Sequence, residues 1–292
     1  MKDSVSVSGH SELNYSALVD AVFTRKSTRG FERPVITEQD REKLQHFINS
    51  IDVPFEQNVD ITLNNSYANS GKTSVFIINV SSDFAAISAP DSLTDKSKAG
   101  FLGELFILFC ESIGISTCWV GSFKKEEAYR QIFGKGEELA GKKIFCLIAM
   151  GYNLSGKGFL NKLTYKIYSS KRKRLEELLS IDSIGEFPDS IKDALELARI
   201  APSARNKQCW YFKVGLAGDE KKDGNSRADR KKGSFIVEIG KPEGYKITGW
   251  PHPDLDVGIA ASHFWLGLKN QNIECSIKIK EIKNRIIWQF GI

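Results

Sequence analysis

The chain has 292 residues, of which 41% are hydrophobic and 26% charged, and its formal net charge is +5. This is ordinary globular composition, and the length suits one large domain or two smaller ones without a staple of disulfides or metal. The mild net charge does not by itself indicate a nucleic-acid partner.

The five cysteines are odd in number and contain no C-x-x-C pair. They argue against a disulfide framework or a zinc site, and they suit a reducing compartment. The first ten residues lack the apolar region of a signal peptide. The most apolar stretch, 101–120, contains Glu104 and Glu111 and is therefore a poor membrane span. We expect a cytoplasmic protein with no membrane partner.

Apolar periodicity predicts the elements of the first half of the chain. A mobile polar lead-in, 1–14, precedes helices at 15–23 and 37–51, strands at 61–63 and 75–80, a helix at 98–113 and a strand at 143–150. The 98–113 helix is apolar on most sides, which predicts burial. Gly114 fits the left-handed position that ends such a helix.

A basic segment follows the first predicted helix. Residues 24–31 read Thr-Arg-Lys-Ser-Thr-Arg-Gly-Phe and combine three cations with three hydroxyls. Arginine offers a planar fork to phosphate oxygens, and the hydroxyls add neutral donors, so the segment suits an anion clamp. The alternative is a solvated basic helix end, which the helix dipole also favours.

A polar turn follows the helix predicted at 189–200. Pro202 ends that helix, Ser203 and Asn206 come next, and the aromatic run from Trp210 starts a strand through Val214. Serine and asparagine can both bond backbone or ligand at a turn. A ligand-free connection between helix and strand remains the alternative.

Two of these segments resemble the nitroreductase family. Residues 201–210, Ala-Pro-Ser-Ala-Arg-Asn-Lys-Gln-Cys-Trp, are similar to its flavin-contacting segment, with Cys209 where proline is common. Residues 25–29 resemble the family's Arg-Arg-Ser-x-Arg, with Lys26 in the second position and Phe31 close behind. Family members are FMN enzymes, typically homodimers with the flavin at the subunit interface. The resemblance implies an α+β fold with central mixed or antiparallel sheets flanked by helices.

The resemblance also implies which residues contact FMN. The clamp and the Arg-x-Arg pair at 172–174 would anchor the phosphate, the loop after the Cys-Trp pair would lie near the reactive nitrogen, and the turn would bond the ring or ribityl chain. The implied set is Arg25, Lys26, Ser27, Arg29, Val120, Gly121, Ser122, Arg172, Arg174, Pro202, Ser203, Ala204 and Asn206. A solvated charge run is the alternative for 171–174.

The pattern of the chain repeats. Residues 189–200 parallel 40–51, and 258–273 parallel 100–115, with Asn272 in the place of Gly114. We predict two nitroreductase-like halves, 15–168 and 169–292, the second with a charged mobile loop at 218–233. The alternative to such an internal duplication is that two amphipathic helices are similar by chance. The first half has the clamp and the second the turn, which predicts an internal pseudo-dimer with one flavin site, as a monomer or a further homodimer.

The resemblance implies an FMN-dependent oxidoreductase that passes a hydride or electrons from NAD(P)H through flavin to a nitro, quinone or similar small acceptor. No catalytic side chain or metal is expected, because the four histidines form no recognisable dyad or ligand set, and His263 suits a buried, hydrogen-bonded core position. One alternative is a flavin carrier or sensor without turnover. Another, a nucleic-acid binder using 171–174 and 221–232, lacks a groove-reading motif.

Overall fold

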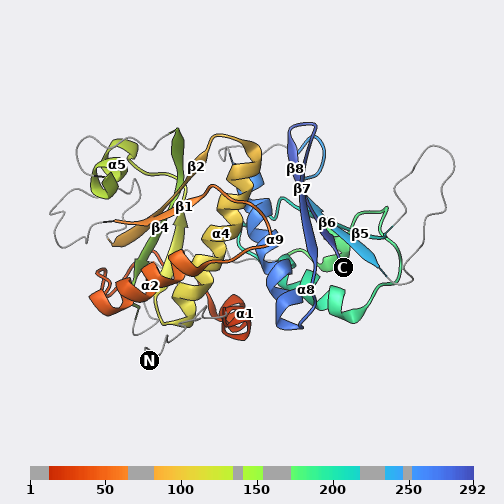
Figure 1. Cartoon of the computed structure of the whole chain (residues 1–292), viewed down its shortest axis with the longest axis horizontal. Helices are drawn as coiled ribbons and strands as arrows, with labels where there is room; N and C mark the ends of the chain where they lie inside the picture. Colours follow the sequence, from red (N-terminus) through yellow and green to blue (C-terminus); the bar gives the residue numbers. More distant parts are fainter. Residues whose placement is uncertain (1–12, 65–81, 134–140, 154–171, 218–233, 246–251) are drawn as a thin grey trace, which may run out of the picture.

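The computed structural model describes residues 13–64, 82–133, 141–153, 172–217, 234–245 and 252–292. Within these ranges, two four-stranded antiparallel sheets lie on opposite sides of a pair of long helices (Figure 1). The fold is therefore α+β with antiparallel sheets, as predicted.

The first sheet and its helices come from the N-terminal part of the chain. In order they are α1 (Tyr15–Thr24), α2 (Glu38–Ser50), β1 (Asp60–Leu63), β2 (Asp83–Pro90), α4 (Leu93–Ser112), β3 (Ser116–Val120), α5 (Lys125–Phe133) and β4 (Lys142–Gly151). The sheet order is β1-β2-β4-β3. The central strands β2 and β4 are buried along nearly their whole length, which explains their continuous apolar sequence.

The second sheet repeats this arrangement. Its elements are α7 (Leu175–Leu178), α8 (Asp189–Arg199), the 3₁₀ turn η1 (Ala204–Asn206), β5 (Tyr211–Leu216), β6 (Phe235–Gly240), α9 (Pro253–Asn270), β7 (Ser276–Ile282) and β8 (Arg285–Gly291). The order is β5-β6-β8-β7. In both sheets the long helix, α4 or α9, connects the second strand to the third, and α2 or α8 precedes the first.

The helices α4 and α9 approach so closely that only glycine fits at their contact. A Cβ atom on Gly100 would collide with the carbonyl oxygen of Leu255, and one on Gly258 would collide with that of Ser97. The two contacts are reciprocal, because Ser97 precedes Leu255 by as many residues as Gly100 precedes Gly258. The helices therefore pack with their backbones in contact around a local two-fold relation.

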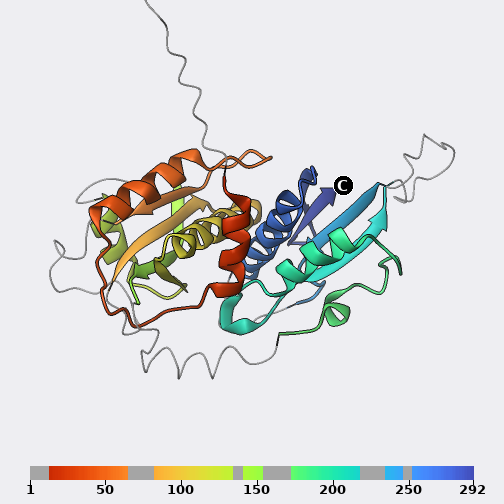
Figure 2. The ribbon, with the colours of Figure 1, turned by 90° about the horizontal axis from the view of Figure 1, so that it is seen from below.

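A large apolar core runs across both parts of the chain, and a smaller cluster that includes Phe84, Val120 and Leu147 belongs to the first sheet. The rings of Phe101 on α4 and Trp288 on β8 stack at 5.0 Å, and Trp265 on α9 lies 5.6 Å from Phe101. Helix α1 lies against both α4 and α9, at the seam between the two halves (Figure 2). This position brings the end of α1 close to elements of the second half.

The predicted helices are present, and the two long ones start earlier than predicted. The helices predicted from Lys98 and Gly258 begin at Leu93 and Pro253. The Ser92 side chain accepts the Asp95 N–H, and proline is favoured at a first helical position. Gly114 and Asn272 have φ values of 82° and 56°, which confirms their left-handed positions.

Some predictions fall outside the described residues. These are the strand at 75–80, the loop at 218–233 and residues 1–12 of the lead-in. Asn14, assigned to the lead-in, instead caps α1, because its side chain accepts the Ala17 N–H. The division at 168 and 169 also falls outside the described ranges and stays a prediction.

Candidate functional site

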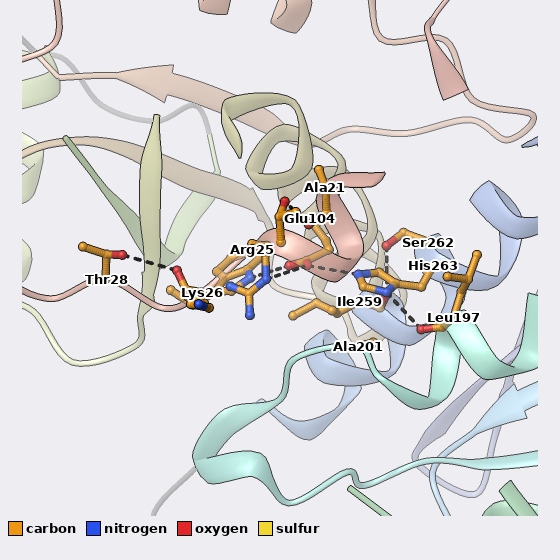
Figure 3. A network of polar contacts seen from close by, with 12 residues as sticks. Ala21, Arg25, Lys26, Thr28, Glu104, Leu197, Ala201, Ile259, Ser262 and His263 are labelled. Atoms are coloured by element: carbon orange, nitrogen blue, oxygen red, sulfur yellow. Dashed lines mark hydrogen bonds and ion pairs between the residues drawn. The ribbon is translucent and has the colours of Figure 1, made fainter. Parts of the chain in front are cut away.

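The basic segment after α1 turns away from the helix at Arg25. This residue leaves helical geometry at φ −55° and ψ 130°, while its N–H still donates to Ala21 O. Ser27 then pairs with Thr117 of β3, and the Thr28 N–H donates to Thr117 O at 2.9 Å. The segment is thus fixed along the edge of the first sheet, with the Arg25 side chain pointing into the seam (Figure 3).

The guanidinium of Arg25 is buried but incompletely bonded. Its side chain is 8% exposed, and Nε lies 3.8 Å from Glu104 Oε1, which is an ion pair but longer than a hydrogen bond. Among the described residues, its Nη1 atom is buried without a hydrogen-bond partner. A buried donor on a cation is costly to leave unpaired, so this N–H is available to an acceptor that the described residues do not supply.

The other members of the clamp lie differently. Ser27 hydrogen-bonds the Cys118 thiol, and the charges of Arg29 and Arg25 act on the same sulfur. Burial nevertheless raises the pKa of Cys118 above its usual range, so the thiol is an unreactive core group. The Lys26 side chain is exposed at the surface.

Arg172 joins the clamp to the turn. Its Nη1 donates to Ala201 O at 2.7 Å and to Asn206 Oδ1 at 2.8 Å. Burial, together with the charges of Arg25 and Arg199, lowers the pKa of Arg172 to about 10, and Glu104 opposes that shift. The guanidinium is therefore still charged at neutral pH, close to other cations.

Arg174 does not join this cluster. Its side chain is 80% exposed and forms an ion pair with Glu177 at 3.7 Å. Its backbone N–H donates to the same carboxylate at 2.7 Å, at the start of α7.

The turn after α8 is held in an unusual backbone conformation. Arg205, Asn206 and Gln208 all have positive φ, at 53°, 55° and 48°, although none is glycine. The Ser203 hydroxyl accepts the Gln208 N–H at 2.9 Å. Left-handed backbone at non-glycine residues costs energy and concentrates at functional sites. The strain supports a binding role for the turn.

A carboxylate from α9 fixes the same turn. The Ala204 N–H donates to both oxygens of Asp256, at 3.2 and 3.3 Å. This bond takes up the Ala204 N–H, one of the turn's own backbone donors. Asp256 was not predicted, because its partner lies 52 residues away and no local pattern connects them.

A buried polar cluster lies between α4 and α9, directly beside Arg25. Glu104 Oε1 lies 3.1 Å from His263 Nε2, and His263 Nδ1 lies 3.1 Å from Leu197 O (Figure 3). Glu104 Oε2 accepts the Trp119 indole N–H at 2.8 Å. His263 is confirmed as a buried core residue with both nitrogens bonded. Glu104 appeared in the sequence only as an interruption of an apolar run.

The loop after β3 starts near the clamp and leads away from it. Val120, the last residue of β3, is buried and pairs with Leu147, while Gly121 and Ser122 are exposed. The same strand contacts Ser27 at Thr117. The structure therefore brings Arg25, Arg172 and the turn together, with this loop at the far end of the adjoining strand.

This arrangement suits an anion with several acceptor oxygens. The charges of Arg25 and Glu104 both act on Arg172, and Arg25 Nη1 has no hydrogen-bond partner in the part of the chain that the structure describes. Within the described ranges, no group of three or more His, Cys, Asp or Glu side chains could hold a metal ion. None of the helices within the same ranges is long and apolar enough to cross a membrane.

Comparison with known proteins assigns the family. Residues 17–268 match the family described as "Putative TM nitroreductase". A crystal structure of a protein described in similar terms, from Thermotoga maritima, shares 17% identity at a TM-score of 0.60, covering 99% of this chain and 98% of that one. The chain therefore belongs to this nitroreductase family and has its fold. No curated protein sequence matches it.

Two further solved structures are partial matches. A nitroreductase with bound FMN from Bacteroides fragilis is 16% identical, at a TM-score of 0.34, covering 49% of this chain and 91% of that one. An FMN-dependent nitroreductase from Clostridium difficile is 12% identical, at a TM-score of 0.37, covering 50% and 94%.

Proposed function

We propose that this protein is an FMN-dependent oxidoreductase that passes a hydride or electrons from NAD(P)H through flavin to a nitro, quinone or similar small acceptor. The observation that carries the proposal is the buried Nη1 of Arg25, which has no hydrogen-bond partner among the described residues, beside a partly buried second cation, Arg172. Family membership of the chain and the FMN named for related nitroreductases support the choice of cofactor.

The residues present fit the phosphate of FMN. Arg25 supplies a free donor, and Arg172 adds a charge that already contacts Asn206 in the turn. Lys26, Ser27 and Arg29 lie on the same segment, and Pro202, Ser203 and Ala204 shape the turn. FMN, when bound, supplies the hydride chemistry, and the protein supplies position and electrostatics. Cations beside the cofactor favour a negatively charged reduced form.

We infer that the chain is a pseudo-dimer with one such site. The equal sheet orders and the reciprocal glycine contacts support two related halves. Extending the offset that pairs 40–51 with 189–200 places Phe55 opposite Ala204, and extending that of 100–115 and 258–273 places Lys98 opposite Asp256. The Phe55 ring packs edge-on against Phe101 and Trp288, at 5.1 and 5.2 Å. A large aromatic therefore stands where the proposed site has alanine, which supports one site per chain.

The test is reduction and reoxidation of the loaded protein. FMN is added to the purified chain, its absorbance is recorded, and NADH or NADPH is added without oxygen. Bleaching, followed by recovery on adding a quinone or nitroarene, is the expected result. Bound FMN that neither nucleotide reduces would identify a flavin carrier or sensor instead. The elution volume on a sizing column distinguishes a monomer from a homodimer.

A further inference from the structure

The ring of His263 lies between two hydrogen-bond acceptors. Nδ1 is 3.1 Å from Leu197 O, and Nε2 is 3.1 Å from Glu104 Oε1. The side chains of His263 and Glu104 are 1% and 0% exposed, so solvent does not supply other partners. The carbonyl cannot donate, so Nδ1 must carry a proton for that contact to be a hydrogen bond.

The second contact requires another proton. A neutral ring with Nδ1–H would place a bare Nε2 opposite Glu104, and two facing acceptors repel. The contact is satisfied either by an imidazolium facing a carboxylate or by a neutral ring facing a carboxylic acid. In both cases the pair holds one proton more than a neutral histidine beside an ionised glutamate.

Other contacts of Glu104 favour the charged form of the pair. Its second oxygen accepts the Trp119 N–H at 2.8 Å, and Arg25 adds a positive charge at 3.8 Å. Burial raises the pKa of Glu104, but the His263 and Trp119 hydrogen bonds and the charges of Arg25 and His263 outweigh it, so the net pKa is lowered as part of the same charged cluster. An ionised Glu104 needs the proton to be on His263.

The position of Leu197 favours the same state. It lies in the last turn of α8, where helix carbonyls lack partners within the helix and carry partial negative charge. A protonated histidine at such an end is stabilised by the helix dipole. The Arg25 charge, 3.8 Å from Glu104, opposes a second positive charge beside that carboxylate. The strands β6 and β8, which pack against α9, carry buried apolar side chains such as Val237 and Trp288.

We propose that His263 is a positioning residue which, as an imidazolium, keeps Glu104 ionised and thereby orients Arg25 so that its free Nη1 binds the flavin phosphate. This inference rests on the proposed function for the identity of the ligand. The contacts reach from α9 through α4 to the end of α1, and Leu197 belongs to the helix that leads into the turn. The same ring therefore aligns the clamp of one half with the turn of the other.

The charge on His263 can be measured directly in the wild-type protein. Nitrogen-15 NMR at pH 7.5 distinguishes rings with two protonated nitrogens from those with one, and the His263 signals are assigned by their loss in His263→Gln. At that pH only about one ordinary histidine in ten is protonated. We expect His263 to carry both protons. A ring with one protonated nitrogen would overturn the inference.

The effect on Arg25 is tested by FMN affinity. His263→Gln and Glu104→Gln should each weaken FMN binding by about tenfold, the scale of one charge-assisted hydrogen bond. The double variant should lose little more than either single one, because the two residues act as a unit. Matched controls are His46→Gln at an exposed position and Glu111→Gln at the end of α4, both with unchanged affinity.

The outcomes separate this inference from the proposed function. If the wild type binds FMN and the variants, folded by circular dichroism, bind it equally well, the positioning role is wrong and the cofactor stands. If the wild type binds no FMN, the proposed cofactor is wrong and the positioning role falls with it. The NMR signature still reports the charge of the ring in that case.

Discussion

Replacing Gly258 by alanine tests the close contact of α4 and α9. The added Cβ would collide with the carbonyl oxygen of Ser97 and lie 3.0 Å from the Phe101 backbone nitrogen. Both obstacles are backbone atoms of α4, so no side chain can rotate away. The two helices must separate, or one must shift along its axis.

The expected loss combines two opposing effects. Alanine is favoured over glycine within a helix by about 1 kcal/mol. Overpacking in a core costs about 1–3 kcal/mol and here reaches the upper end of that range, because backbone meets backbone. The net loss of unfolding free energy is therefore about 2 kcal/mol. At roughly 2–4 °C per kcal/mol for a chain of this size, Tm should fall by about 4–8 °C.

The change should also weaken the site. Glu104 and His263 follow Gly100 and Gly258 by little more than one helical turn, so separated helices lengthen the contact between them. The assays are thermal unfolding by circular dichroism and FMN titration, with Gly185→Ala as the control. No atom lies within 4 Å of a Cβ at Gly185. A Gly258→Ala protein with wild-type Tm and wild-type affinity would refute the reasoning.

Three further results are expected. Arg172→Gln should weaken FMN binding, measured by fluorescence titration, at least about tenfold, because it removes a charge and two hydrogen bonds. The control Arg130→Gln, which removes an exposed ion pair, should leave the FMN affinity unchanged. Phe55→Ala should lower the unfolding free energy measured in urea by about 2 kcal/mol, which is a smaller loss than for a fully buried ring. The variant should still bind one FMN per chain. Binding of a second FMN by this variant would contradict the account. Folding lowers the pKa of Glu104 from its usual value of 4.5, so the ionised carboxylate stabilises the folded protein at pH values above 4.5 and this contribution is lost as the pH falls further. In urea unfolding at decreasing pH below 4.5, the difference in unfolding free energy between wild type and Glu104→Gln should therefore shrink. A difference that stays constant with pH would contradict this prediction.

Local patterns predicted the helices α1, α2, α4 and α8 and the strands β1, β4 and β5. Pro202 ends its helix, and Thr37 caps α2, since its side chain accepts the Asp40 N–H. Helix caps and helix stops depend on residues only a few positions apart, so they can be recognised in the sequence alone. Cys209, where proline is common, is buried, and burial raises the pKa of its thiol, in agreement with a packing role.

The polar contacts across the seam could not be predicted in the same way. Glu104 and His263 are 159 residues apart, and each lies in an apolar helix that sequence assigns to the core. Their pairing depends on where α4 crosses α9, which two glycines determine through backbone contact. From the sequence, Arg172 and Arg174 were both predicted to contact the phosphate. In the structure only Arg172 contacts the turn after α8, because Arg174 points to solvent and pairs with Glu177.

The central claim is most directly tested by counting FMN in the purified protein. After saturation with FMN and removal of the excess, the flavin is released by denaturation, identified by chromatography and quantified against the protein concentration. The account predicts one FMN per chain, held at the seam between the Arg25 clamp and the turn at Ser203. Two FMN molecules per chain, or a protein that retains none, would contradict it.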